Sequence, residues 1–158
     1  MPANRIMIIA GEASGDMHGA KLAQSLKKLD PEAFLFGVGG SAMNAEGVHL
    51  LVDARMLAVV GITEVFSKLP TIYRSMSTVK KAIKRIKPHV LVLIDFPDFN
   101  FHAAAFAKKL QIPILYYISP QIWAWRQGRV KKIKRLVDHM AVIFPFEAAF
   151  YRKHQVPV

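Results

Sequence analysis

The sequence has 158 residues, of which 53% are hydrophobic and 21% charged, and it contains no cysteine. This length and composition indicate one globular domain and exclude a disordered chain, and the lack of cysteine excludes a disulfide framework and thiolate metal sites. No run approaches the ~18 apolar residues of a membrane span, and no charged segment with a long apolar region opens the chain, so we expect neither a transmembrane helix nor a signal peptide.

Positive charge is concentrated in two regions of the chain. The net charge is +11 and the isoelectric point is about 10.1. Residues 65–94 contain seven Lys or Arg and no acid, and residues 99–137 contain eight and no acid. Such an imbalance indicates an anionic partner: a nucleic acid, a phosphorylated ligand or an anionic membrane surface.

Apolar runs alternate with segments of helical periodicity along the whole chain. We expect strands at residues 5–10, 33–38, 48–52, 90–94, 112–118 and 139–144. We expect helices at residues 20–29, 42–45, 62–76, 101–110, within 122–136, and at 145–154. This alternation predicts an α/β fold, a Rossmann-like three-layer α/β/α domain with a mostly parallel sheet.

Three local features refine these expectations. The small residues between 11 and 19 predict a loop that leads into the first helix. Ser41 is suited to capping the second helix. Pro70 is expected to interrupt or kink the long helix that begins at Ile62, after which an apolar line continues through Val79 and Ile83.

The strand at residues 90–94 is a run of five branched aliphatic side chains that ends abruptly at Asp95. Ligands in an open parallel sheet bind just beyond the carboxyl ends of the strands. Asp95 is therefore either a helix cap or a general base beside Phe96 and Phe99, and the residue pattern leaves both open. Asp98 is expected to be a helix cap.

Two further loops are candidates for ligand binding. Residues 11–19 allow close backbone approach and anion binding at a helix start, or they form a well-capped turn. They match neither the dinucleotide fingerprint nor the P-loop. Residues 119–126, with two tryptophans, either line a mixed pocket or serve packing. His18 has no second metal ligand at a suitable spacing, so we expect no metal site.

The helix at residues 62–76 has a broad apolar stripe flanked by Lys and Arg. Such a stripe either packs into the core or lies in a membrane interface.

Six motifs, taken together, resemble those of one known family, although no single motif is specific enough alone. They are AGEASGD at 10–16, GVGG at 37–40 with Met43, VGITEV at 60–65, IDFPDFN at 94–100, YISPQIWAWR at 117–126 and FPFE at 144–147. In this order they closely resemble the lipid-A-disaccharide synthase family. Ser41 departs from the proline that is common in the family.

The resemblance implies that residues 1–158 form the N-terminal, acceptor-side domain of a GT-B glycosyltransferase whose UDP-sugar domain is absent from this chain. The family transfers 2,3-diacylglucosamine, with inversion, from UDP-2,3-diacylglucosamine to 2,3-diacylglucosamine 1-phosphate. The products are lipid A disaccharide 1-phosphate and UDP. The resemblance further implies no cofactor and a cytoplasmic, peripheral location on the inner membrane, and it leaves homo-oligomer formation open. We expect the isolated domain to be inactive.

The resemblance also assigns roles to residues. It implies Asp95 as the catalytic base. It implies substrate binding by Glu12, Ser14, Asp16, Ser119, Gln121, Trp123 and Arg126. It makes the apolar helix a candidate for contact with acyl chains or an anionic membrane surface, through Val65, Phe66, Leu69, Ile72 and Tyr73.

Two alternatives to this function remain at the level of the sequence. One is a basic α/β module that binds nucleic acid, although the resemblance implies no nucleic-acid partner. The other is half of a different GT-B or sugar-nucleotide enzyme.

Overall fold

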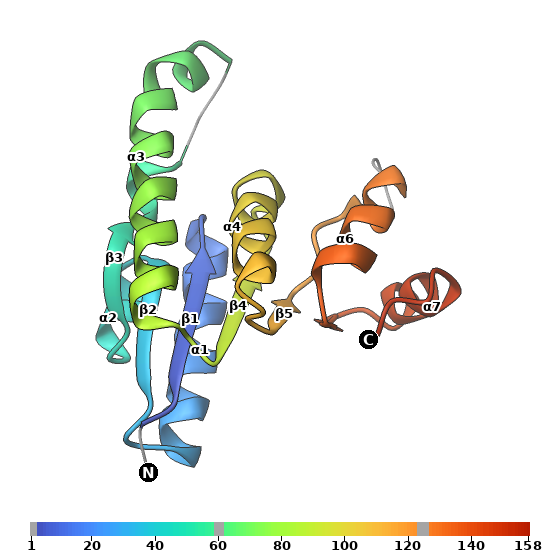
Figure 1. The fold of residues 1–158 in the computed structure, drawn as a ribbon, viewed down its shortest axis with the longest axis horizontal. Helices are drawn as coiled ribbons and strands as arrows, with labels where there is room; N and C mark the ends of the chain where they lie inside the picture. The colour runs from blue at the N-terminus through green and yellow to red at the C-terminus, as the bar shows by residue number, and fades with distance from the viewer. Residues whose placement is uncertain (1–2, 59–61, 123–126) are drawn as a thin grey trace.

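A computed structural model describes residues 3–58, 62–122 and 127–158 (Figure 1). The strands are β1 (Arg5–Ala10), β2 (Phe34–Gly39), β3 (His49–Asp53), β4 (Val90–Ile94), β5 (Ile114–Tyr117) and β6 (His139–Ala141). The helices are α1 (Ala13–Leu29), α2 (Ser41–Ala45), α3 (Ile62–Ile86), α4 (Pro97–Lys109), α6 (Val130–Leu136) and α7 (Pro145–Lys153), with short 3-10 turns η1 (Ala54–Met56) and η2 (Gln127–Arg129).

The six strands form one sheet in the order β3-β2-β1-β4-β5-β6, and every neighbouring pair is parallel. The predicted α/β fold with a mostly parallel sheet is therefore confirmed. The strand order reverses between β1 and β4, where Ala10 pairs with Ile94. Ligands of doubly wound sheets bind in the crevice at such a reversal. We therefore expect the segments that follow β1 and β4 to border a ligand-binding site.

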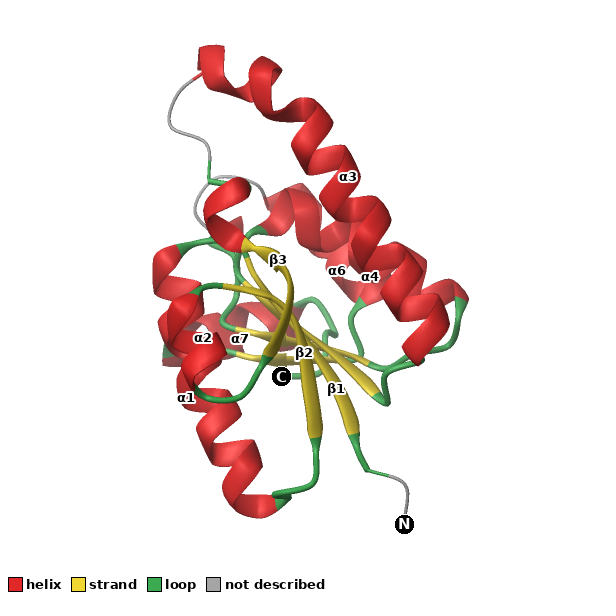
Figure 2. Ribbon diagram, turned by 90° about the vertical axis from the view of Figure 1, so that its left-hand side faces the viewer, coloured by secondary structure: helices red, strands yellow, loops and turns green. Residues whose placement is uncertain are grey.

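Helices cover both faces of the sheet, with α1 and α2 on one side and α3 and α4 on the other (Figure 2). Side chains along β1 alternate between the two cores, because Ile8 belongs to the cluster on the α1 side and Met7 to the cluster on the α3 side. Both side chains are fully buried. Burial on both faces explains why the central strands are continuous apolar runs rather than alternating ones.

Helix α1 begins at Ala13, so the loop predicted for residues 11–19 is wrong. The small residues serve helix packing instead. A Cβ on Gly15 would lie 3.3 Å from the Cβ of Ala10, and a Cβ on Gly19 would lie 2.6 Å from the Sδ of Met43. These glycines let α1 approach the sheet and α2 closely.

Both predicted helix caps are also wrong. The cap residue of α2 is Gly40 rather than Ser41, since the Asp16 side chain supplies the acceptors for the first amides of that helix. Helix α4 begins at Pro97 rather than residue 101, with Phe96 in the cap position, because proline is well suited to the first helical turn. Asp98 therefore lies inside the first turn of α4.

Helix α3 continues from Ile62 to Ile86 through Pro70, so the predicted interruption does not occur. Proline removes one main-chain hydrogen bond of the helix. The second half of α3 nevertheless stays packed against the sheet through its apolar side chains. Val79 and Ile83 are fully buried against the sheet, whereas the first half of α3 extends beyond the sheet (Figures 1 and 2).

Candidate active site

The turn between β4 and α4 is held in a strained backbone conformation. Asp95 and Phe96 have φ angles of 42° and 46°, in the left-handed region that non-glycine residues rarely adopt. The carbonyl of Asp95 accepts hydrogen bonds from Asn100 Nδ2 at 2.8 Å and from the Tyr116 hydroxyl at 2.5 Å. Asn100 and Tyr116 are both fully buried. These buried donors fix the turn and with it the position of the Asp95 side chain.

The segment after β1 is fitted to the same turn. A Cβ at Gly11 would lie 2.2 Å from Cδ1 of the Phe96 ring, which is far inside contact distance. Only glycine leaves room for this ring. The two segments at the strand reversal therefore interlock.

The Asp95 carboxyl group is half-buried at the carboxyl end of β4. Burial raises its pKa, the negative charge of Glu12 raises it further, and a hydrogen bond from the Phe96 backbone acts in the opposite direction. A carboxylate with a raised pKa holds a proton more strongly, which favours a role as general base.

Two pockets adjoin this turn and share Asp98. The smaller has a volume of about 410 Å³ and is bordered by Asp95, Asp98, Gln121 and Arg129. The larger, of about 800 Å³, lies between α3 and α4 and is lined mainly by apolar side chains, among them those of Leu57, Leu69, Ile72, Tyr73, Met76, Phe96 and Phe99. The two pockets can therefore bind one ligand that has a polar group beside Asp95 and an apolar chain between α3 and α4.

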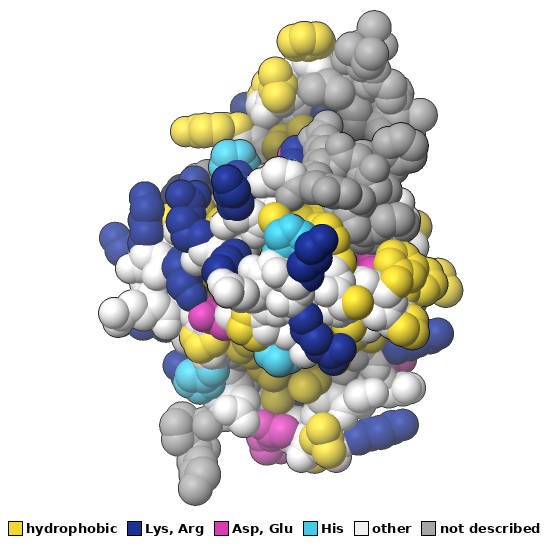
Figure 3. Space-filling view, turned by 90° about the vertical axis from the view of Figure 1, so that its right-hand side faces the viewer, with side chains coloured by type: hydrophobic (Ala, Val, Ile, Leu, Met, Phe, Trp, Pro, Cys, Tyr) yellow, Lys and Arg dark blue, Asp and Glu magenta, His cyan; other side chains and the backbone are white. Residues whose placement is uncertain are grey.

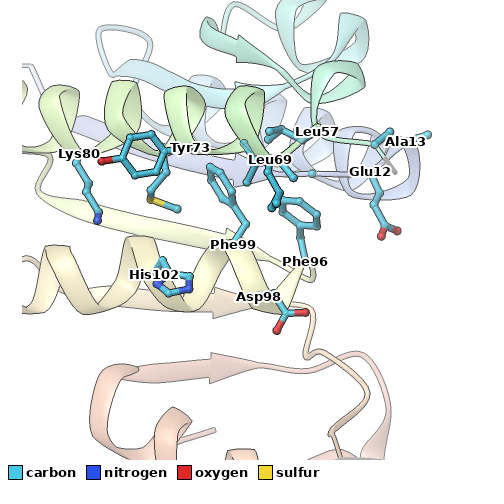
Figure 4. A pocket seen from close by; sticks show the side chains of 14 residues that line it. Glu12, Ala13, Leu57, Leu69, Tyr73, Lys80, Phe96, Asp98, Phe99 and His102 are labelled. Carbon is cyan, nitrogen blue, oxygen red and sulfur yellow. The ribbon is translucent and has the colours of Figure 1, made fainter. Parts of the chain in front are cut away.

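The larger cavity is apolar in its middle and charged at its ends (Figure 4). The rings of Phe96 and Phe99 stack with their centroids 5.5 Å apart and point toward Leu69. Glu12 lies toward one end of the cavity and Lys80 toward the other. This distribution suits an acyl chain whose polar parts remain at the rims.

The predicted acyl-contact residues of α3 lie on the exposed half of the helix. Leu69, Ile72 and Tyr73 line the larger cavity. Phe66 is 72% exposed, Leu69 48% and Tyr73 79%, so an apolar surface faces solvent here. The side chain of Val65 lies outside the described residues. In the part of the chain that the structure describes, no helix has the combination of length and apolar character that crossing a membrane requires.

The predicted residues of the first loop have three different environments. Glu12 is exposed and lines the larger cavity. Ser14 is exposed in the first turn of α1. Asp16 is 8% exposed, and its carboxylate accepts hydrogen bonds from the backbone amides of Gly40, Ala42 and Met43 at 2.8–3.0 Å. The contacts of Asp16 are therefore those of a helix cap for α2.

The predicted site residues of the second loop also lie in different environments. Gln121 is exposed and borders the smaller pocket. Ser119 is buried, donates to the carbonyl of Pro120 and lies 2.5 Å from the hydroxyl of Tyr151 in α7. Trp123 and Arg126 lie outside the described residues.

Arg129 was missed as a site residue, although it borders the smaller pocket and its Nη2 lies 2.7 Å from Oδ1 of Asp98. In the sequence it belongs to a basic run that is most simply a solvated helix face. Only its ion pair with Asp98 in the first turn of α4 and its place at the pocket distinguish it from the other described cations of that run. Within residues 3–58, 62–122 and 127–158 no group of three His, Cys, Asp or Glu is arranged to hold a metal ion.

Several solved structures have this fold. UDP-GlcNAc 2-epimerase from Neisseria meningitidis, solved bound to UDP-GlcNAc, superposes with a TM-score of 0.66 at 11% identity, over 97% of this chain and 43% of that one. MurG from Acinetobacter baumannii superposes with a TM-score of 0.57 at 12% identity, over 90% and 42%. At these identities the likeness shows the fold alone: an α/β domain with a parallel sheet, whose structural neighbours are GT-B glycosyltransferases and epimerases.

The sequence comparisons define the family. The family described as Lipid-A-disaccharide synthetase matches residues 6–158. The lipid-A-disaccharide synthase of Geobacter metallireducens is 54% identical over 99% of this chain, and that of Coxiella burnetii is 52% identical over 97%. The chain belongs to the lipid-A-disaccharide synthase family. It spans 41% of the length of each of these two relatives.

Proposed function

We propose that this chain is the acceptor-side half of a lipid-A-disaccharide synthase. The observation that carries the proposal is the Asp95 carboxylate, which borders a polar pocket beside an 800 Å³ apolar cavity in a chain of this family. The proposed substrates are UDP-2,3-diacylglucosamine as donor and 2,3-diacylglucosamine 1-phosphate as acceptor. The products are the disaccharide 1-phosphate and UDP.

In the proposed reaction, the 6-hydroxyl oxygen of the acceptor attacks the anomeric carbon of the donor sugar. The bond between this carbon and the UDP phosphate oxygen breaks, UDP leaves with the bonding electrons, and the anomeric configuration inverts. Asp95 accepts the proton of the hydroxyl during the attack. A fixed turn suits this role, because a general base must lie within hydrogen-bond reach of the proton it removes.

The acyl chains of the substrates explain the apolar features near the base. The cavity between α3 and α4 would hold an acyl chain, with Leu69, Ile72 and Tyr73 as contacts. The exposed side chains of α3, together with surrounding Lys and Arg, would contact an anionic bilayer surface. We therefore place the protein on the cytoplasmic face of the inner membrane as a peripheral protein.

The second half of the active site is proposed to come from outside these residues. Since the chain spans about two-fifths of its relatives, the remaining length would supply the UDP-sugar domain that faces Asp95. Donor binding and transfer would then require both domains.

The test is a product assay on a protein of the relatives' full length that contains this chain, with both lipids supplied in detergent micelles. The expected result is tetraacyl disaccharide 1-phosphate and an equal amount of UDP, with neither formed when the acceptor is omitted. Conversion of a UDP-sugar in the absence of acceptor, without disaccharide, would instead indicate an epimerase and contradict the proposal.

A further inference from the structure

The smaller pocket contains a cation that no part of the proposed chemistry has yet used. Arg129 borders this pocket together with Asp95, and only 24% of its side chain is exposed. Its Nη2 donates to Oδ1 of Asp98 at 2.7 Å, which is its one ion pair among the described residues. A guanidinium carries five N–H donors in a planar fork, so this single contact leaves several available.

A second cation lies against the same aromatic ring. Lys132 Nζ is 5.0 Å from the centroid of Phe101 and Arg129 Cζ is 5.8 Å from it. Phe101 is 2% exposed, so both cations lie within about 6 Å of the centroid of one buried ring. Within the described parts of the chain no carboxylate forms an ion pair with Lys132. Lys and Arg side chains are spread over this side of the molecule (Figure 3).

Asp98 is a partner that can be exchanged at little cost. Its side chain is 80% exposed, so the carboxylate regains full hydration when it releases Arg129. An ion pair whose carboxylate partner is exposed is readily replaced by a competing anion. A phosphate group offers Arg129 a bidentate contact that is stronger than one hydrogen bond to a mobile carboxylate.

We propose that Arg129, with Lys132 as the second cation, binds the phosphomonoester group of the acceptor, and that Asp98 holds Arg129 in place until this group arrives. The inference rests on the proposed function, since it assigns the recognition of the acceptor phosphate to the pocket of Asp95. A volume of about 410 Å³ accommodates one sugar ring between Asp95 and Arg129. The sugar hydroxyl then faces the base while the phosphate faces the cations.

The negative charge of Asp95 and Asp98 in this pocket sharpens the selectivity. Both carboxylates disfavour an anion that does not pair with Arg129. Removal of Arg129 therefore changes the pocket from one that accepts a phosphate to one that repels it. Removal of the Asp98 charge has the opposite effect, because it eliminates the competitor for Arg129.

The test compares two acceptors in a protein of the relatives' full length: 2,3-diacylglucosamine 1-phosphate and the same lipid without its phosphate. For Arg129→Gln we expect the KM for the phosphorylated acceptor to rise about tenfold to a hundredfold, the effect of losing a charge-assisted contact. The KM for the unphosphorylated acceptor and for the donor remains unchanged. Arg129→Lys retains part of the preference, and Asp98→Asn lowers the KM for the phosphorylated acceptor.

The matched control is Arg135→Gln, which removes the same charge from an exposed position of α6 and leaves every KM unchanged. Equal losses with both acceptors in Arg129→Gln, an unchanged KM, or a rise in KM with Asp98→Asn would overturn the inference. Melting temperatures of all variants exclude a folding effect.

A calorimetric titration with glucosamine 1-phosphate separates this inference from the proposed function. Wild-type protein binds the sugar phosphate, and Arg129→Gln binds it at least tenfold more weakly. Should the wild type form no disaccharide yet show this difference, the proposed function fails and the phosphate site stands. Equal binding by the two proteins rejects the site, whatever the product assay gives.

Discussion

Asp16 and Asp95 follow neighbouring strands of the same sheet, yet their carboxylates have opposite environments. Asp16 is 8% exposed and accepts three backbone amides at the start of α2. Asp95 is half-buried, borders an open pocket, and has a pKa raised first by burial and then by Glu12. One carboxylate accepts three hydrogen bonds at a helix start, whereas the other faces a pocket with a raised pKa.

The difference shows that the side chain of an acid after a strand stays available for a proton when the fold gives its carboxyl group few hydrogen-bond donors. The carboxylate oxygens of Asp16 are occupied by the amides of Gly40, Ala42 and Met43. In Asp95 the main-chain carbonyl, not the carboxylate, accepts the hydrogen bonds of Asn100 and Tyr116. The fold thus fixes the residue through its backbone and leaves its side chain available.

The largest expected effect concerns the proposed second half of the site. The 158-residue chain alone, supplied with donor and acceptor, should form no disaccharide, because the proposed UDP-sugar domain that would face Asp95 lies outside these residues. A coupled assay for UDP release and thin-layer chromatography of the lipid product measure this. Product above the no-enzyme background would show that the site within these residues is sufficient.

Asp16→Ala should destabilise the fold by about 2–4 kcal/mol, since three backbone amides, two of them buried, lose their side-chain acceptor. Urea unfolding followed by circular dichroism measures the loss. Asp30→Ala is the control, because Asp30 is only half-buried and accepts one side-chain hydrogen bond, from Asn4. A cost for Asp16→Ala no greater than for Asp30→Ala would show that the capping contacts are not what holds α2.

The double variant Phe66→Ser and Leu69→Ser should weaken binding to liposomes that contain anionic phospholipid by roughly tenfold to a hundredfold, because two apolar side chains no longer enter the interface. Cosedimentation measures the binding. The matched control is Leu29→Ser with Leu110→Ser, two leucines that are 85% and 41% exposed outside α3. Loss of folding in the α3 variant, or equal weakening in the control, would argue against docking through α3.

Glu12→Gln should move the acid limb of the pH profile of kcat/KM to lower pH. A general base must be ionised, so kcat/KM falls as the pH drops below its pKa. The charge of Glu12 raises the pKa of Asp95, and its removal therefore lowers that pKa. Glu32→Gln, an exposed acid that borders neither pocket, should leave the limb in place. A limb that does not move in Glu12→Gln would mean that Glu12 does not act on the base.

Much of the sheet could be predicted from the sequence, because buried parallel strands are continuous apolar runs such as residues 90–94. The residues at which α1 and α4 begin could not be predicted from the sequence. Gly15 and Gly19 look like loop residues until the sheet is packed against Gly15 and α2 against Gly19. The role of Asp16 could not be read either, since its donors lie 24 to 27 residues away in the chain.

The position of Asp95 at the mouth of a pocket followed from its place after a buried strand, but the strain of the turn did not. Nothing in the residue types indicates that Asp95 and Phe96 adopt left-handed angles or that Gly11 must leave room for a ring. Arg129 could not be predicted as a site residue for a similar reason, because a basic run does not indicate which of its cations faces a pocket.

The most direct measurement of the central claim is the rate of disaccharide formation by Asp95→Asn at saturating substrates, in a protein of the relatives' full length and expressed per folded molecule. The variant keeps the backbone bonds of the turn, so its melting temperature should stay near that of the wild type, while its rate should fall about 10²- to 10⁴-fold, the typical contribution of a general base. A rate equal to that of the wild type would remove Asp95 from the chemistry and contradict the contrast with Asp16.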